Sequence, residues 1–262
     1  MKPAPFEYVR ATSVDEAVEA LAGEDSKVLA GGQSLVPALN MRVLRPSLLV
    51  DVNRVAELDD VEESGDALRV GATVRQSDGR LWSHPALAEV LPHVGHTVTR
   101  NRGTVCGSLA HADSAAELPL ALVALGGSVT AASERGRREV GAVELFSGPY
   151  TTTLEPDELV VESSWPLVRE GDGFAFEELA QRHGDFALCM AAAHVRGDAL
   201  RVVVGAVTPY PTLLEVDPER SGESAAAQVE PWASVHASPA YLRQLVRVLV
   251  ERAVARARER AA

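Results

Sequence analysis

Two short stretches of the chain combine glycine with side chains that donate hydrogen bonds. Residues 30–35 read AGGQSL and end the apolar run that begins at Val28, and residues 104–108 read TVCGS. Glycine permits a positive backbone φ and a close approach to the main chain, so successive N–H groups can line a concavity that binds an anion. Ser34 and Ser108 add hydroxyl donors. Two such loops could hold a diphosphate from two sides without a lysine or arginine; the alternative is that both are only turns.

Neither stretch has the spacing of a common nucleotide-binding motif. The sequence contains no GxGxxG and no GxxxxGK[ST] here, which excludes the Rossmann and Walker arrangements. Its two cysteines, Cys106 and Cys189, are far apart and form no CxxC, so the chain cannot supply four thiolates to an iron–sulfur cluster or a structural zinc. We interpret Cys189 as a small buried hydrophobic residue. The residues alone therefore indicate a diphosphate-containing cofactor and leave its kind open.

Other polar groups are weaker candidates for chemistry. His93 and His96 have the i, i+3 spacing of a metal pair, but no third ligand follows nearby, so structural or surface histidines are favoured. His111 and Asp113 offer acid–base groups. Ser108 and His111 do not make a hydrolase triad, because the sequence lacks a GxSxG elbow. We expect no catalytic side chain and no metal ligand on this chain.

Composition limits the function classes. The chain has 262 residues and a net charge of −12, which argues against a nucleic-acid surface. Its longest uncharged run, residues 118–133, is too short for a membrane span. The start, MKPAPFEYVR, has no apolar segment of the signal-peptide kind, so we expect a cytoplasmic protein. We interpret the arginine-rich stretch 252–260 as the solvated face of a helix end.

Hydrophobic spacing predicts the elements that position these loops. Ser13 and Glu16 form a capping box for a helix that ends at Gly23. A strand over 27–30, the GGQS loop, a short helix over 35–42 and a buried strand over 47–52 then make a compact β–loop–α–β unit. Further strands are expected over 67–74, 129–132, 138–143 and 159–165, further helices over 85–99 and 118–125, and mostly loop over 100–117.

The last third of the chain changes character after the charged, glycine-rich segment 169–173, which we take as a domain boundary. Residues 187–195 and 199–207 predict an antiparallel hairpin. Its alanine-rich, poorly alternating pattern suggests that one strand is buried on both faces. Ser238 and Pro239 begin the clearest helix, whose apolar residues recur at i, i+3, i+4 and i+7.

Four stretches together resemble a known family. AGGQSL, RNRGTVCGSLAHADSAAELP, LEPDELV and RHGDFAL, in this order and spacing, are similar to the FAD-binding medium subunit of molybdenum hydroxylases, the carbon monoxide dehydrogenase and xanthine dehydrogenase group. The resemblance covers nearly the whole chain. It implies an α+β fold: a two-lobed FAD-binding domain of the PCMH type over 1–170, with lobes of about 1–55 and 56–170, and a C-terminal domain over 171–262 with a three-stranded antiparallel sheet and helices.

The resemblance also implies which residues bind the cofactor. Ala30, Gly31, Gly32, Gln33, Ser34 and Leu35 would form the first diphosphate loop, and Thr104, Val105, Cys106, Gly107 and Ser108 the second. Glu117 would lie near the FAD, at a ribose or the adenine end. Phe186 matches an aromatic position beside the isoalloxazine ring, with Asp185 and Arg182 close by.

The sequence departs from the family pattern in three places. Cys106 replaces a glycine of the second loop, which would put a Cβ and a sulfur where the backbone is expected to approach the cofactor. The arginine that usually follows the stretch TPYPTLLEVD is missing. The chain is also short between Leu214 and Trp232.

The function implied by the resemblance is electron transfer. The chain would be an oxidoreductase subunit whose FAD accepts electrons from the [2Fe–2S] clusters of a small partner subunit and passes them to an external acceptor. The molybdenum cofactor would sit on a large partner subunit. Two alternatives stay open: a stand-alone FAD-dependent oxidase or dehydrogenase of a small organic substrate, and an assembly subunit that has lost the flavin because of Cys106.

Overall fold

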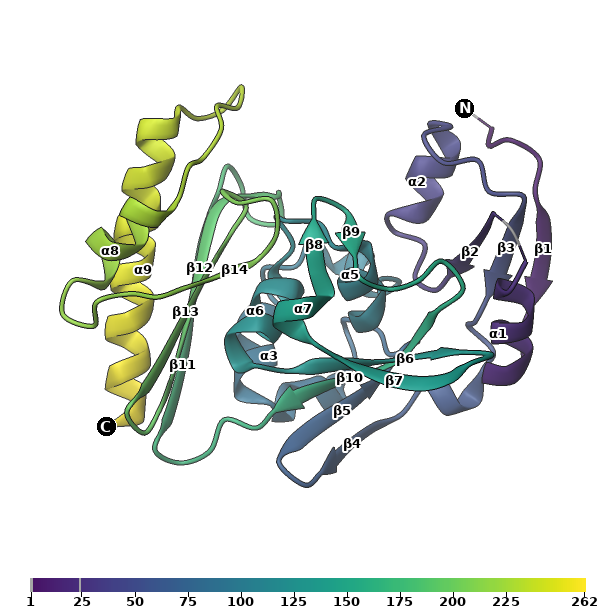
Figure 1. Ribbon diagram of the computed structural model, residues 1–262, viewed down its shortest axis with the longest axis horizontal. Coiled ribbons are helices and arrows are strands. Elements are labelled where there is room, and N and C mark those ends of the chain that lie inside the picture. The colour runs from purple at the N-terminus through teal and green to yellow at the C-terminus, as the bar shows by residue number, and fades with distance from the viewer. Residues whose placement is uncertain (1, 24) are drawn as a thin grey trace.

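Three larger sheets follow one another along the chain, each built from a different part of the sequence (Figure 1). The computed structural model describes residues 2–23 and 25–262. In Figure 1 the N-terminal sheet lies at the right, the middle sheet at the centre and the C-terminal sheet at the left. No helix among these residues is long and apolar enough to cross a membrane.

The first sheet is parallel and carries the first glycine loop. Its strands β1 (Glu7–Arg10), β3 (Leu48–Asp51) and β2 (Ser26–Leu29) lie in that order, with α1 (Val14–Leu21) and α2 (Leu35–Asn40) in the connections. The predicted cap of α1 is confirmed, since Ser13 accepts the N–H of Glu16; the Glu16 carboxylate reaches back to the N–H of Thr12, one residue before the N-cap. The GGQS loop follows the carboxyl end of β2, at the edge where ligands of open parallel sheets bind.

The second sheet is antiparallel, in the order β4-β5-β10-β6-β7. Its strands are β4 (Val61–Ser64), β5 (Ala67–Gly71), β10 (Leu159–Pro166), β6 (Ser128–Ser133) and β7 (Gly136–Gly141), and α7 (Ala142–Leu145), β8 (Phe146–Gly148) and β9 (Thr151–Thr152) extend its far end. Helix α6 (Glu117–Leu125) is buried along its whole length because it packs between this sheet and the C-terminal one.

The segment between β5 and α6 differs from the prediction. The single helix expected over 85–99 is two helices, α3 (Pro85–Val90) and α4 (Thr97–Arg100), separated at Gly95, whose φ is +47°. Two 3-10 turns, Ala56–Leu58 and Gly79–Ser83, lie before them. The expected loop over 100–117 is also wrong in part, because Val105–His111 form helix α5. Thr104 caps this helix by accepting the N–H of Gly107 at 3.0 Å.

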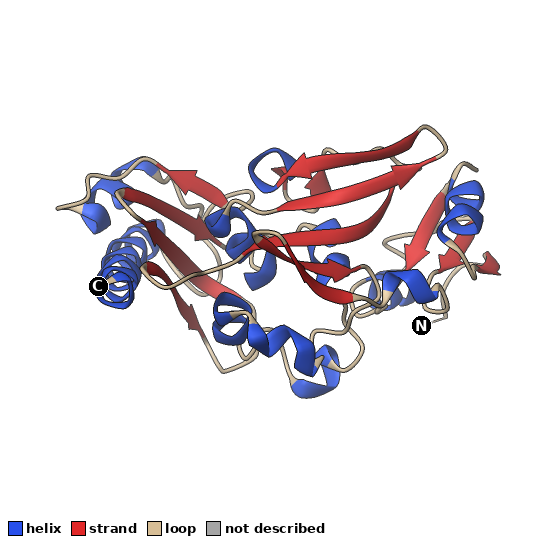
Figure 2. Ribbon diagram, turned by 90° about the horizontal axis from the view of Figure 1, so that it is seen from below, coloured by secondary structure: helices blue, strands red, loops and turns tan. Residues whose placement is uncertain are grey.

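The third sheet is antiparallel, in the order β11 (Asp172–Ala180), β12 (Ala187–Arg196), β13 (Ala199–Gly205) and β14 (Thr212–Leu214). The three strands expected here are therefore joined by a short fourth at the edge. Strand β12 is buried on both faces, as its alanines predicted, because α6 covers one side and α9 (Pro239–Ala261) the other. Figure 2 shows α9 along its axis beside this sheet; α8 (Ser221–Gln228) packs on α9.

Candidate cofactor-binding site

The first glycine loop needs both of its glycines. Gly32 has φ +71°, a conformation that side chains rarely adopt. A Cβ on Gly31 would overlap the carbonyl oxygen of Arg102 and lie 2.7 Å from the Cα of Gly103. The backbone N–H groups from Gly31 to Ser34 donate to no residue that the structure describes, and Gln33 and Ser34 are exposed. This loop therefore presents a row of free donors suited to an anion.

The second predicted loop is the first turn of α5. Its residues divide by face: Val105 and Cys106 are buried, while Gly107 and Ser108 are partly exposed. A Cβ on Gly107 would lie 2.5 Å from the Thr104 Oγ1 that caps the helix, so glycine is required here too. Gly103, the residue before Thr104, packs closely against the side chain of Gln76. The Gln76 side-chain amide donates to the Thr104 carbonyl.

The structure brings the first loop against the segment directly before the second. Gly31 lies against Arg102 and Gly103, although the two segments are far apart in the sequence. A cofactor held by the first loop would therefore also reach the start of α5. The two stretches singled out in the sequence therefore lie close together in the fold.

A hydrogen-bonded clamp that the sequence reasoning missed holds the loops together. The Asn53 side-chain amide donates to the Ala30 carbonyl at 2.9 Å and to Asp51 Oδ1 at 2.6 Å. The Arg75 guanidinium donates to Asn53 Oδ1 at 2.5 Å and to the Arg102 carbonyl at 2.6 Å. The sequence contained a signal for the Asn53 half of this clamp. Asp51 and Asn53 are polar residues at the end of β3, and the first glycine loop follows β2. Because neighbouring parallel strands end at the same edge of a sheet, polar side chains at the end of β3 are expected beside that loop.

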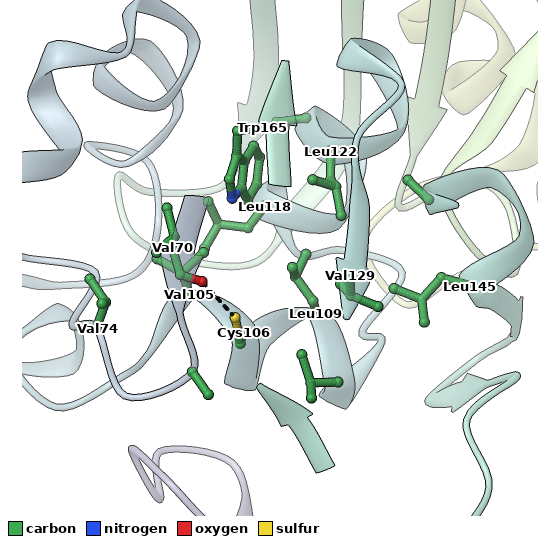
Figure 3. Packing of buried hydrophobic residues seen from close by; sticks show 14 of the residues in the cluster. Val70, Val74, Val105, Cys106, Leu109, Leu118, Leu122, Val129, Leu145 and Trp165 are labelled. Carbon is green, nitrogen blue, oxygen red and sulfur yellow. Dashed lines mark hydrogen bonds between the residues drawn. The ribbon is translucent and has the colours of Figure 1, made fainter. Parts of the chain in front are cut away.

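The side chain of Cys106 lies among buried hydrophobic residues (Figure 3), contrary to the expectation that its sulfur would lie where a cofactor approaches the backbone. It is 1% exposed, and Sγ lies 3.4 Å from the Val70 carbonyl and 3.4 Å from Ser163 Oγ. Trp165 donates to the same Ser163 hydroxyl. Burial raises the pKa of the Cys106 thiol to about 12, so it is an inert core group.

Glu117 begins α6 and is buried, with 6% of its surface exposed. Burial raises the pKa of its carboxyl to about 8, so the group is mostly protonated at neutral pH. Asp113 is buried close by and accepts the backbone N–H of Ala115, while His111 packs its ring on Tyr150. Asp113 and His111 therefore each have a partner within the chain.

The turn between β11 and β12 carries the remaining predicted residues. Phe186 is 72% exposed, and Arg182, which accepts the backbone N–H of Asp185 through its carbonyl, is exposed too. The turn packs closely against the segment before α4: a Cβ placed on Gly184 would lie 2.5 Å from Nδ1 of His96. Phe186 thus presents an uncovered aromatic ring on the C-terminal part of the molecule.

No group of three metal-ligating side chains occurs among residues 2–23 and 25–262. The donor set that is present consists of free backbone N–H groups, glycines without room for a Cβ, a serine hydroxyl and an exposed aromatic ring. These groups fit a diphosphate with an attached flat ring system.

Comparisons with known proteins agree with this chemistry. Residues 4–167 match the family described as the FAD binding domain in molybdopterin dehydrogenase. The chain is 40% identical to the 6-hydroxypseudooxynicotine dehydrogenase complex subunit alpha of Paenarthrobacter nicotinovorans, covering 100% of this chain and 97% of that one. It is 36% identical to the nicotine 6-hydroxylase medium subunit of the same organism, covering 98% and 99%.

The fold is shared with a solved structure. The carbon monoxide dehydrogenase of Hydrogenophaga pseudoflava contains a chain that superposes with a TM-score of 0.94 at 31% identity, over 100% of both chains. The similarity therefore extends beyond the part matched by the family description and includes the C-terminal sheet with its helices.

Proposed function

The chain belongs to the family of FAD-binding domains in molybdopterin dehydrogenases, and on this basis we propose that it transfers electrons from a partner subunit to an external acceptor. It is the FAD-binding medium subunit of a molybdenum hydroxylase, an oxidoreductase complex. The proposed partners are a large subunit with the molybdenum cofactor and a small subunit with [2Fe–2S] clusters. When bound, FAD supplies the redox chemistry, accepting and releasing electrons.

The observation that carries the proposal is the contact of the first glycine loop with Arg102 and Gly103, directly before the second loop. The N–H groups from Gly31 to Ser34 and the Ser108 hydroxyl would hold the diphosphate, and Phe186 would lie beside the ring. Asn53 and Arg75 would keep the two loops at a constant separation. No side chain is needed as a general acid or base at the diphosphate.

The position of Cys106 removes the ground for a flavin-free assembly subunit, since its sulfur does not obstruct the loop. We also propose a cytoplasmic location. Both cysteines are buried free thiols, which is typical of a protein in a reducing compartment.

The first test is a visible absorption spectrum of the purified chain before and after addition of FAD. We expect a flavin band that denaturation releases into solution. Co-expression with the genes for the two partners should then give a stoichiometric complex. Absence of the band with excess FAD contradicts the proposal. Reduction of the bound flavin by a small organic molecule without any partner would favour the stand-alone enzyme instead.

A further inference from the structure

The carboxylate at the end of β3 accepts hydrogen bonds from two directions. Asp51 is buried, with 8% of its surface exposed. Its Oδ1 accepts the backbone N–H of Asn53 at 2.9 Å and the Asn53 side-chain amide at 2.6 Å. Its Oδ2 accepts the hydroxyl of Tyr8 and lies 3.7 Å from Nε of Arg10. One carboxylate therefore joins β1, which carries Tyr8 and Arg10, to the residue that contacts the first glycine loop.

The side-chain amide of Asn53 lies between two groups of opposite hydrogen-bonding character. Its NH2 group donates to Asp51 and to the carbonyls of Leu29 and Ala30, the last two at 3.3 Å and 2.9 Å. Its Oδ1 accepts from the Arg75 guanidinium at 2.5 Å. A carboxylate only accepts hydrogen bonds and a guanidinium only donates them. The pair therefore permits one of the two orientations of the amide.

The ionised state of Asp51 maintains this orientation at neutral pH. Burial by itself would raise the pKa of the Asp51 carboxyl, but the hydrogen bonds from Tyr8 and Asn53 outweigh it and hold the pKa below its usual value. The group is therefore a carboxylate that cannot donate to the Asn53 side chain, and the opposite orientation of the amide would place two oxygens against each other.

The carbonyl that Asn53 holds belongs to the peptide group that begins the donor row of the loop. The Ala30 carbonyl and the Gly31 N–H lie in one planar peptide group and point in opposite directions. A hydrogen bond from Asn53 to this carbonyl therefore also sets the direction of the Gly31 N–H. The carbonyl of Leu29 accepts the N–H of Val52 at 3.2 Å as well, so the start of the loop is attached to the end of β3 at more than one point.

We propose that Asp51 is a positioning residue for FAD, because it fixes the orientation of the Asn53 amide and, through this amide, the backbone of the first glycine loop. The inference rests on the proposed function. Asp51 acts only through Asn53, and Tyr8 and Arg10 of β1 hold the carboxylate in place. The first strand of the chain thereby contributes to cofactor binding although it lies on the far side of β3 from the loop.

The test is the Kd for FAD at neutral pH, measured by flavin fluorescence on the apo full chain in a double-mutant cycle of Asp51→Asn and Asn53→Ala. Asp51→Asn keeps the size of the side chain but supplies a donor, so the Asn53 amide is free to turn. We expect each single variant to raise the Kd about tenfold. The double variant should bind FAD no more weakly than Asn53→Ala alone, whereas independent effects would multiply to about a hundredfold.

Two further variants complete the design. Tyr8→Phe removes only the hydroxyl that donates to Asp51, and Tyr8 is 44% exposed, so little packing is disturbed. We expect a smaller loss of FAD affinity that disappears in the Asn53→Ala background. Asp157→Asn is the matched control, because the partly buried Asp157 carboxylate accepts from Arg135 at 2.5 Å and 3.0 Å, between other strands. It should keep the wild-type Kd.

The outcomes separate this inference from the proposed function. A wild-type chain that binds no FAD contradicts both. A folded Asp51→Asn protein with the wild-type Kd overturns the inference alone, and so does a double variant whose loss is the product of the two single losses. If Asp51→Asn does not fold, Tyr8→Phe decides: an unchanged Kd, or a loss that persists in the Asn53→Ala background, refutes the role of Asp51.

Discussion

At the scale of single residues, Arg75 links the segments that carry the two cofactor loops. Its guanidinium donates to the side chain of Asn53, which follows β3, and to the backbone carbonyl of Arg102. Hydrogen bonds from a charged group contribute about 1.5–3 kcal/mol each. The loop spacing, and with it the affinity for FAD, therefore depends on a side chain that we do not expect to touch the cofactor's reacting ring.

We expect Arg75→Ala to raise the Kd for FAD by about tenfold or more, since roughly 1.4 kcal/mol corresponds to a factor of ten. The loss arises because the free loops would sample separations at which the diphosphate is not held from both sides. Titration of the apo chain with FAD, followed by flavin fluorescence, measures the change. Arg69→Ala is the control: Arg69 lies on β5, is about half exposed and pairs with Glu162 at 3.4 Å. If Arg75→Ala and Arg69→Ala bound FAD with equal affinity, the proposed role of Arg75 in holding the two loops would be contradicted.

At the scale of elements, the critical contact is the first loop against the start of α5. Gly31→Ala inserts a methyl group where the Arg102 carbonyl already lies, so one of the two segments must move. We expect both a lower Tm and at least a tenfold weaker binding of FAD. Gly79→Ala is the control, because no atom lies within 4 Å of a Cβ placed there. Thermal unfolding and FAD content of the purified variants measure the effect; an unchanged FAD content in Gly31→Ala speaks against the shared surface.

The lobe and domain boundaries stay a prediction at this scale. The three sheets support it, since their strands fall within residues 7–51, 61–166 and 172–214. Yet the core of the first two sheets is continuous, and Phe174 and Met190 of the C-terminal sheet also belong to it. Residues on both sides of the predicted domain boundary therefore pack in the same hydrophobic core.

At the scale of the whole molecule, α9 is connected to the FAD-binding part by ion pairs with Glu89 on α3. Arg256 pairs with Glu89 at 2.8 Å, and Arg260 pairs with the same carboxylate. The arginine-rich end of α9 was interpreted as a solvated face, and these two side chains do reach solvent, being 40% and 43% exposed; the fold also brings α3 to the end of α9, so that both make ion pairs there. Arg256 also pairs with Glu177 at 2.5 Å.

We expect Glu89→Ala to lower the free energy of unfolding by about 1–3 kcal/mol, because the largely buried Glu89 carboxylate accepts hydrogen bonds from Arg256, from Arg260 and from the backbone N–H of Phe176. Hydrogen exchange should rise first in α9 and β11. Urea unfolding and exchange mass spectrometry measure both effects, with the exposed Glu259→Ala on the same helix as the control. Slower or equal exchange in α9 would show that Glu89 does not hold the C-terminal part in place.

The sequence by itself determined the elements with strong local signals. The capping box at Ser13, the apolar stripe of the last helix and the alanine-rich hairpin all predicted their elements, because the spacing of side chains along one element is a local property. The glycines of the first loop could also be identified, since a turn after a strand is local. Weak strands such as β1, β4 and β14 were missed because their stability comes from pairing with distant strands.

Only the tertiary structure decided which distant residues contact one another and which side chains point into the core. The sequence could not tell that Gly31 touches Gly103, that Asn53 and Arg75 join the loops, or that the sulfur of Cys106 points into the core. Each depends on the packing of segments distant in sequence. The same holds for the ion pair of His93 with Glu178, which forms only when β11 packs against α3. Contacts between distant segments are properties of the assembled fold, and no local pattern of residues says which segments meet.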